Sequence, residues 1–295
     1  MNNLKITFVW CLCVLIASCS SLQIQPPATS NASTSTQTTP VTNANRVVAL
    51  TPLTADIVHR LDKTKLVGMS GSRLLNENPE FSGIARVSEG RSQPNLEKIV
   101  ALKPDLVIGA IGFHDPVLEK LKSLGVATIA TQLDSWQSLE ALTQQLAERL
   151  QTDPVPLLKT YQNLLPAQAS ESVSTLVLAS RQPLLTPNKT SWAGDLISKF
   201  GAANLVADLQ GQSPMKGYVT LSPEKVLQAN PEVLILVDVE GGDVNQFKSE
   251  PFWKDLKAVK NNRVYILDYY GFVNAGSIDA IAKACSQLKQ IYVTQ

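Results

Sequence analysis

The chain has 295 residues, 44% of them hydrophobic, and its 26 Lys and Arg against 25 Asp and Glu give a formal net charge of +1. Because the charge is balanced and no basic run occurs, nucleic acid is not expected as a partner. The chain contains two histidines, whereas a metal site normally needs several converging histidines and carboxylates. The sequence therefore predicts neither a resident metal nor another cofactor.

The first 45 residues predict an export signal followed by a tether. A short polar start leads into an apolar stretch, residues 6–17, that is too short to span a bilayer permanently. Residues 16–19 read Ile-Ala-Ser-Cys, which has the form of a lipobox and predicts a lipoprotein signal peptide over residues 1–18 with lipid on Cys19. The alternative is an ordinary signal peptide that contains a Cys.

Residues 19–45 are predicted to form a disordered tether. From Ser20 onward this stretch has no charged residue and is rich in Ser, Thr, Gln, Asn and Pro, so it buries too little apolar surface to fold. We therefore expect an exported protein, in the periplasm or at the cell surface, anchored to the membrane through Cys19.

After residue 46 the pattern alternates between strand and helix. In the first half, strands are expected at 47–50, 66–69, 106–111 and 126–131, and helices at 53–61, 116–124 and 138–150. A helical connector follows at 154–171, with a break at Pro166. In the second half, strands are expected at 173–179 and 263–267, and helices at 193–200 and 277–292. This alternation predicts an α/β fold with parallel or mixed sheets.

A fourteen-residue pattern occurs twice, at residues 95–108 and 222–235, 127 positions apart. In each copy Asn95 or Ser222 can cap a helix, apolar residues follow at helical spacing, and a Pro ends the helix before an apolar strand. A repeat with this spacing implies two similar lobes. We predict an N-terminal lobe over 46–151, a connecting helix over 152–171 and a C-terminal lobe over 172–295, with a ligand cleft between the lobes.

The second copy also permits an enzymatic interpretation. Residues 222–225 fit the Ser-x-x-Lys pattern of penicillin-binding proteins and β-lactamases, and residues 189–191 imitate their Lys-Thr-Gly. The order of the two motifs is inverted, however, and Asn95 stands where Ser222 would be the nucleophile. A helix cap explains both residues, so no catalytic residue is predicted, and a cell-wall hydrolase or an inactive scaffold stays as the outside alternative.

These features together resemble the substrate-binding proteins of ABC importers for ferric siderophores, haem and cobalamin. The resemblance rests on the two copies, the tether behind the lipobox, and Arg-Val-Tyr at 263–265 after the run 256–262, and it covers residues 46–295. It implies two Rossmann-like lobes joined by a single connecting helix, small hinge motion, and a monomer that delivers its ligand to a permease dimer with ATPase subunits. The chain departs from some relatives in its short connector and in having Cys285 but Phe200 where those relatives pair two cysteines.

The resemblance also implies one permease-contacting glutamate in each lobe. The matching positions here are Glu97 and Glu224, which would meet arginines of the permease dimer. An exposed carboxylate in each lobe would give a two-point match to a two-fold partner. The alternative is local, since a carboxylate in a helix's first turn gains about 0.3–1 kcal/mol from the helix dipole alone.

The expected ligand contacts are aromatic residues and one cation near the cleft. Tyr218 matches an aromatic that stacks on the ligand in cobalamin-binding relatives, and His114 follows a strand at the edge expected to face a ligand. Aromatic rings can cover a macrocycle or an aryl siderophore, and Arg91 suits an anionic group. Lys189 and Lys216 could assist. The predicted ligand-binding set is Arg91, His114, Trp192, Tyr218, Tyr269 and Tyr270.

Each of these aromatics could instead be a half-buried packing residue, and His114 could lie in a solvated loop. The resulting hypothesis is a solute-binding lipoprotein, not an enzyme, that captures a ferric siderophore and delivers it to the permease. Haem and cobalamin are the alternative ligands.

Overall fold

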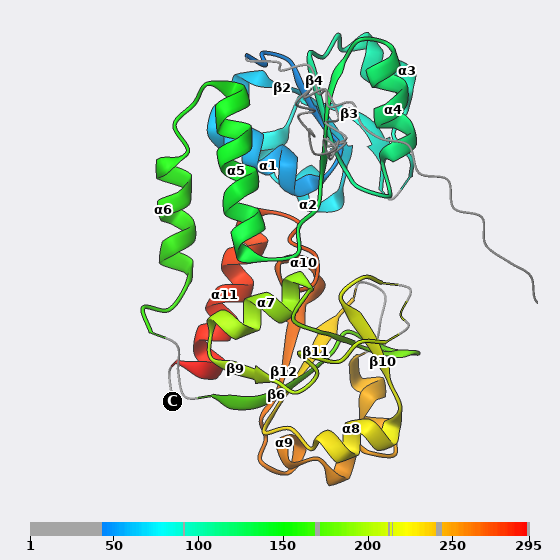
Figure 1. Cartoon of the computed structure of the whole chain (residues 1–295), viewed down its shortest axis with the longest axis vertical. Coiled ribbons are helices and arrows are strands. Elements are labelled where there is room, and N and C mark those ends of the chain that lie inside the picture. The colour runs from blue at the N-terminus through cyan, green and yellow to red at the C-terminus, as the bar shows by residue number, and fades with distance from the viewer. Residues whose placement is uncertain are drawn as a thin grey trace, which may run out of the picture. The chain divides into compact units, whose positions relative to one another are not determined.

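A computed structural model describes residues 43–90, 92–168, 172–211, 213, 215–239 and 244–293 (Figure 1). The predicted signal peptide, the tether through residue 42, Cys19 and Arg91 lie outside these residues. Within the described chain, every helix falls short of the length and apolar character needed to cross a bilayer.

The N-terminal lobe is built on a parallel sheet with strand order β3-β2-β1-β4-β5. Its strands are β1 Val47–Ala49, β2 Leu66–Gly71, β3 Ala85–Glu89, β4 Leu106–Ala110 and β5 Ala127–Thr131. Its helices are α1 Pro52–Asp62, α2 Arg73–Asn76, α3 Leu96–Ala101, α4 Asp115–Ser123 and α5 Trp136–Leu150, with 3-10 turns η1 Lys63–Lys65 and η2 Pro79–Phe81. The central strands are apolar throughout because the sheet is covered on both faces.

The C-terminal lobe has a parallel sheet of order β12-β11-β6-β9 and an antiparallel sheet of order β10-β8-β7. Its strands are β6 Val173–Leu178, β7 Ser180–Arg181, β8 Leu184–Pro187, β9 Ala202–Asn204, β10 Tyr218–Leu221, β11 Val233–Asp238 and β12 Val264–Asp268. Its helices are α7 Trp192–Lys199, α8 Pro223–Ala229, α9 Lys257–Lys260, α10 Tyr269–Phe272 and α11 Ile278–Tyr292, with 3-10 turns η3 Val244–Ser249 and η4 Trp253–Asp255.

The two parallel sheets share one topology. The order β2-β1-β4-β5 in the first lobe corresponds to β9-β6-β11-β12 in the second, and the repeated strands β4 and β11 occupy the same interior place. The predicted α/β fold with two Rossmann-like lobes is therefore confirmed. The antiparallel sheet and the edge strand β3 are additions that the sequence analysis did not anticipate.

The repeat extends to backbone detail. The side chain of Asn95 accepts a hydrogen bond from the Lys98 amide at 2.9 Å, and Ser222 accepts one from the Lys225 amide at 3.3 Å. Lys103 and Asn230, at equivalent positions before Pro, both have left-handed backbones, with φ of 49° and 39°. Both copies thus begin and end their helices by the same local means.

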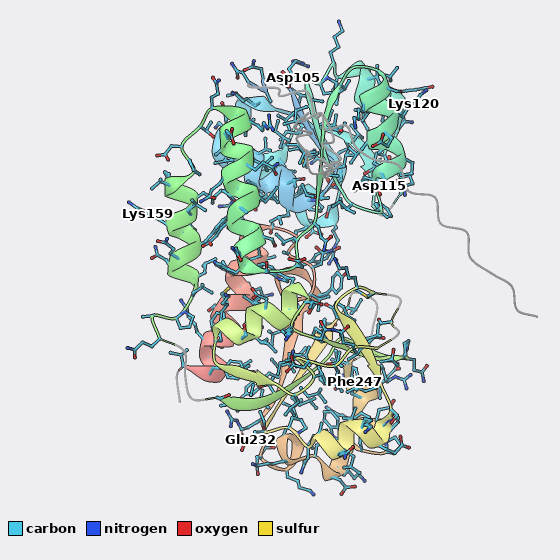
Figure 2. The ribbon with its side chains drawn as sticks, in the orientation of Figure 1. Asp105, Asp115, Lys120, Lys159, Glu232 and Phe247 are labelled. Carbon is cyan, nitrogen blue, oxygen red and sulfur yellow. The ribbon has the colours of Figure 1, made fainter. Side chains whose placement is uncertain are left out.

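The acids that follow each Pro also match. The backbone amides of Asp105 and Glu232 each donate to a carbonyl of the neighbouring strand segment, Arg46 or Ser174, at 3.0 Å. Figure 2 labels both acids, one in each lobe. Each copy of the repeat therefore fixes the start of the next parallel strand in the same way.

The connecting helix is shorter than predicted. Helix α6 spans Val155–Leu164, so it ends two residues before the expected break at Pro166 and does not reach residue 171. It packs against α5 and α11 (Figure 1). The exact lobe boundaries at residues 151 and 172 stay predictions.

One apolar core runs through both lobes. It joins Trp136 of α5 and Tyr161 of α6 to Trp192 of α7, and the two indole rings stack at 6.0 Å with 14° between their planes. Two carboxylates reinforce the junction, that of Asp56, which is buried, and that of Asp195, which is half-buried. Asp195 accepts from the Trp136 amide and Asp56 accepts from the Ile278 amide, each at 2.7 Å. Because a packed core has few alternative arrangements, the lobes are held in a defined relation.

Candidate functional site

The carboxyl ends of the parallel strands in the second lobe carry polar and aromatic side chains. Asp238 ends β11 and Asp268 ends β12, side by side in register. Tyr269 and Tyr270 follow at once, with ring centroids 5.4 Å apart in an edge-to-face arrangement. Residues at this edge of an open α/β sheet face the ligand crevice, so the position of both acids at a strand end was a usable sequence signal.

A tight turn holds the two tyrosines. Gly271 has φ of +89°, and a Cβ built on it would lie 2.0 Å from the carbonyl oxygen of Ala280 in α11. Only glycine allows this close approach of the turn to the helix. The Trp192 indole N–H donates to the Gly271 carbonyl at 2.9 Å. The backbone carrying Tyr269 and Tyr270 is therefore fixed from two sides.

The first of two neighbouring hollows lies between the lobes; we call it the charged hollow. It has a volume of about 450 Å³, and Leu75 and Phe81 of the first lobe and Tyr269 and Tyr270 of the second contribute to its walls. Its charged side chains are Asp56, Arg73, Asp238, Asp268, Asp279 and Lys283. Within this set Lys283 pairs with Asp268.

The second hollow, here the aromatic hollow, lies within the C-terminal lobe and has a volume of about 480 Å³. Its wall is mainly apolar and aromatic, with Tyr218 of β10, Phe247 of η3 and Tyr269 among the large side chains. Figure 2 places Phe247 in this lobe. Tyr269 lines both hollows, so they adjoin at this residue.

Arg181 is a lining residue that the sequence analysis missed. It ends the two-residue strand β7 and borders the aromatic hollow. Its guanidinium donates to the Glu250 carboxylate at 3.1 Å, and its side chain is 29% exposed. Arg181 comes three residues after the end of β6, at the same carboxyl edge of the sheet as Asp238 and Asp268. This strand-end position was the available sequence signal for a ligand contact.

Tyr218 is almost fully enclosed in the aromatic hollow. Its side chain sits on β10, which pairs antiparallel with β8, and 6% of the residue is exposed. Burial, with a smaller contribution from Tyr269, raises the pKa of the Tyr218 phenol far above its ordinary value. The phenol therefore stays protonated at neutral pH.

Trp192 and His114 lie outside the described linings of both hollows. Trp192 is buried in the core between the lobes and holds the Gly271 turn. His114 is also buried, and its Nδ1 accepts a hydrogen bond from the Ala110 amide at 2.9 Å. Burial lowers the pKa of His114, although Asp115 opposes the shift. Trp192 therefore supports the Tyr269–Tyr270 turn from behind, whereas His114 holds its own strand-to-helix turn.

Glu97 and Glu224 occupy equivalent places in the first turns of α3 and α8, and both are exposed. The Ser222 hydroxyl and the local backbone hold the pKa of Glu224 below its usual range. The Lys225 ammonium donates to Gln228 at 3.2 Å, while the Ser222 hydroxyl caps the helix. These contacts lack the Ser–Lys pairing that a nucleophile would need.

Neither assisting lysine lines a described hollow. Lys189 pairs with Asp208 at 2.6 Å, and Lys216 is exposed. Within the described residues, no group of three or more His, Cys, Asp or Glu side chains is arranged to hold a metal ion.

Two α/β lobes with adjoining hollows at their strand ends define a solute-binding protein, and comparisons with known proteins agree. The model of the periplasmic binding protein family matches residues 47–153 and 159–270. The chain therefore belongs to the periplasmic binding protein family.

Individual relatives are binding proteins rather than enzymes. The chain is 26% identical over 287 residues to the Fe(3+)-citrate-binding protein YfmC of Bacillus subtilis, covering 87% of this chain and 86% of YfmC. It is 27% identical over 263 residues to the vitamin B12-binding protein of Vibrio parahaemolyticus, covering 83% and 90%.

A solved ABC transporter substrate-binding protein from Listeria monocytogenes has the same fold, with a TM-score of 0.67 at 21% identity over 85% of this chain and 99% of that one. The comparisons give the hydrolase alternative no support.

Proposed function

We propose that this protein captures a ferric siderophore between its lobes and delivers it to an ABC permease. The observation that carries the proposal is the shared wall at Tyr269, which joins the aromatic hollow to the charged hollow. A chelate with an apolar or aryl body and polar metal-binding arms has surfaces that fit both linings. Haem and cobalamin are the alternative cargoes.

The chemistry of the linings favours a complete chelate over an iron centre that needs a protein ligand. Tyrosine binds ferric iron as phenolate, and the raised pKa of Tyr218 opposes that form. The described residues also lack a metal-holding cluster. An iron complex whose own donors fill the coordination sphere avoids both difficulties.

Anionic parts of the ligand would meet guanidinium groups. Arg181 borders the aromatic hollow, and its exchange of Glu250 for a ligand carboxylate would retain a charge-assisted hydrogen bond. Arg91 is proposed as a further anion contact from the sequence alone, since it lies outside the described residues. Trp192 is proposed to act by holding the Gly271 turn that carries the two tyrosines, and His114 by holding the carboxyl end of β4.

A fluorescence titration tests the cargo and the site together. We expect a ferric siderophore to quench tryptophan emission with a lower Kd than hemin, cobalamin or ferric citrate. Tyr269→Ala should weaken that binding about tenfold or more, because both hollows lose a wall. Tyr269→Phe, which keeps the ring, should weaken it less.

Each alternative has its own outcome. If hemin or cobalamin bound more tightly than the siderophore, that compound would be assigned as the ligand instead. Unchanged ligand affinity in Tyr269→Ala would show that the two hollows are not the binding site.

We also propose that Glu97 and Glu224 dock the loaded protein on the permease. Both carboxylates are exposed, one in each lobe, and a two-fold partner offers two equivalent basic positions.

The proposed membrane anchor is lipid on Cys19, which lies outside the described residues. The lipobox at residues 16–19 supports it. In membrane fractionation, Cys19→Ala should move the protein from the membrane fraction to the supernatant, with wild type as the control. Retention in the membrane after confirmed signal cleavage would rule the anchor out.

A further inference from the structure

Helices α3 and α8 share a surface feature that the fold does not require. In the described chain, Ile99 is the buried residue of α3, and Val226 is the buried residue of α8. The next residue along each helix is large, apolar and exposed: Val100 is 43% exposed and Leu227 is 42% exposed. These two positions are also 127 residues apart.

Single exposed apolar residues are normal on protein surfaces. Here, however, the position repeats in both lobes with nearly equal exposure. The positions that build the two copies are the caps Asn95 and Ser222 and the buried anchors Ile99 and Val226. Val100 and Leu227 are neither caps nor buried anchors, so these local roles do not explain why both are apolar.

The exposed apolar residue lies beside the proposed docking glutamate. Glu97 and Val100 are three residues apart on α3, and Glu224 and Leu227 are three apart on α8. Residues at this spacing lie on the same helix face. Each lobe therefore presents one carboxylate with one apolar side chain next to it.

We infer that Val100 and Leu227 form the apolar half of a docking surface for the two-fold permease, an inference that rests on the proposed function. The complementary partner presents, at two symmetry-related places, a cationic side chain beside an apolar depression. The glutamates supply electrostatic attraction, and the apolar pair supplies contact area that excludes water.

Charge selects this partner over two others. A second copy of this chain meeting the same surface would bring Glu97 or Glu224 against a like charge. An anionic lipid surface would repel both carboxylates as well. A protein surface with two-fold symmetry that offers a cation beside an apolar depression matches both the carboxylate and the apolar side chain of each lobe.

The test is the affinity of the full chain, without added ligand, for the transporter reconstituted in lipid nanodiscs. V100S/L227S should bind about tenfold more weakly than wild type, because two apolar contacts are lost. The loss should persist at high salt, since apolar burial is not screened. V100T/L227Q, which keeps side-chain volume, should show the same loss, while both variants keep the wild-type thermal midpoint.

The matched control is L124S/V155S. Leu124 and Val155 are 54% and 47% exposed and lie on α4's end and on α6. This control should bind within about twofold of wild type. A similar loss in the control would overturn the inference, because any exposed apolar pair would then suffice.

E97A/E224A separates this inference from the proposed docking function. Its affinity should fall most at low salt. If it weakens binding while both apolar variants bind as wild type does, the inference fails and the proposed docking stands. If neither class of variant weakens binding, both fail.

Discussion

His114 shows how a residue expected at a ligand surface can be used by the backbone. Its Nδ1 accepts from the Ala110 amide, which requires an unprotonated nitrogen. The sequence correctly indicated that His114 comes just after a strand. Its position at a strand end does not say, however, whether the ring points toward a ligand or back to the backbone of its own loop. That choice depends on the packing of Gly109 beneath the ring.

His114 predicts a pH dependence of stability. Burial lowers its pKa in the folded protein below the ordinary value of 6.5, so the unfolded chain binds the proton more readily. The stabilising contribution is therefore present above pH 6.5 and is lost as pH falls from there through the lowered pKa.

Urea unfolding at about pH 7.5 and about pH 5 measures this loss. His114→Asn keeps an acceptor at the helix start but does not titrate, so its stability should fall less than that of wild type. Equal losses in both proteins would contradict the assignment.

The aromatic residues divide in a way that composition could not foresee. Tyr269 and Tyr270 line the hollows, whereas Trp192 is enclosed in the core and reaches their turn through the Gly271 carbonyl. A tryptophan at the start of a helix gives no sequence signal for its burial against Trp136, because that contact joins segments 56 positions apart. Long-range packing decides the role.

Individual elements were predictable where their signals are local. The last helix was expected at 277–292 and spans Ile278–Tyr292, because the Ser277 cap and the apolar spacing both lie in the sequence. The antiparallel sheet was missed because β7 has two residues and its pairing with β8 and β10 depends on neighbours. Short strands carry too little periodicity to be recognised.

The junction of α1 and α11 gives a prediction at the scale of elements. The buried Asp56 carboxylate accepts from the Ile278 amide at the start of α11 and from Arg60 at 2.7 Å. Burial raises the pKa of Asp56, with Arg60 opposing the shift. Asp56→Ala should lower the free energy of unfolding by about 1–3 kcal/mol, because the amide loses its acceptor.

Asp56→Asn is the matched comparison. Its amide oxygen can still accept from Ile278, so denaturant unfolding should show a smaller loss than for Asp56→Ala. If the two variants were equally unstable, the hydrogen bond to α11 would not be the stabilising contact. The Arg60 pair with Asp279 is present in both variants.

For the whole molecule, substitution of both exposed glutamates should separate transfer from capture. Glu97→Ala with Glu224→Ala should keep ligand affinity and change stability by about 1 kcal/mol or less per site. Uptake in cells should fall sharply, and reversal of both charges to Lys should reduce it further by repelling a basic partner.

The control for this pair is Glu119→Ala with Glu148→Ala, which removes two exposed carboxylates from α4 and α5. That variant should import normally. Normal uptake by the double Lys variant would defeat the docking proposal, and a parallel loss of ligand affinity would assign both glutamates to the cleft or the core instead.

The continuous core through both lobes has a consequence for the rate of import. Since Trp136, Tyr161 and Trp192 join the lobes in one packed core, we expect the surface that meets the transporter to change little when a ligand binds. Protein without ligand can then occupy the same docking site on the permease as protein with ligand. When the ligand is scarce, overproduction of the binding protein relative to the transporter should therefore slow import. Unloaded binding protein would compete with loaded protein for the limited number of permeases.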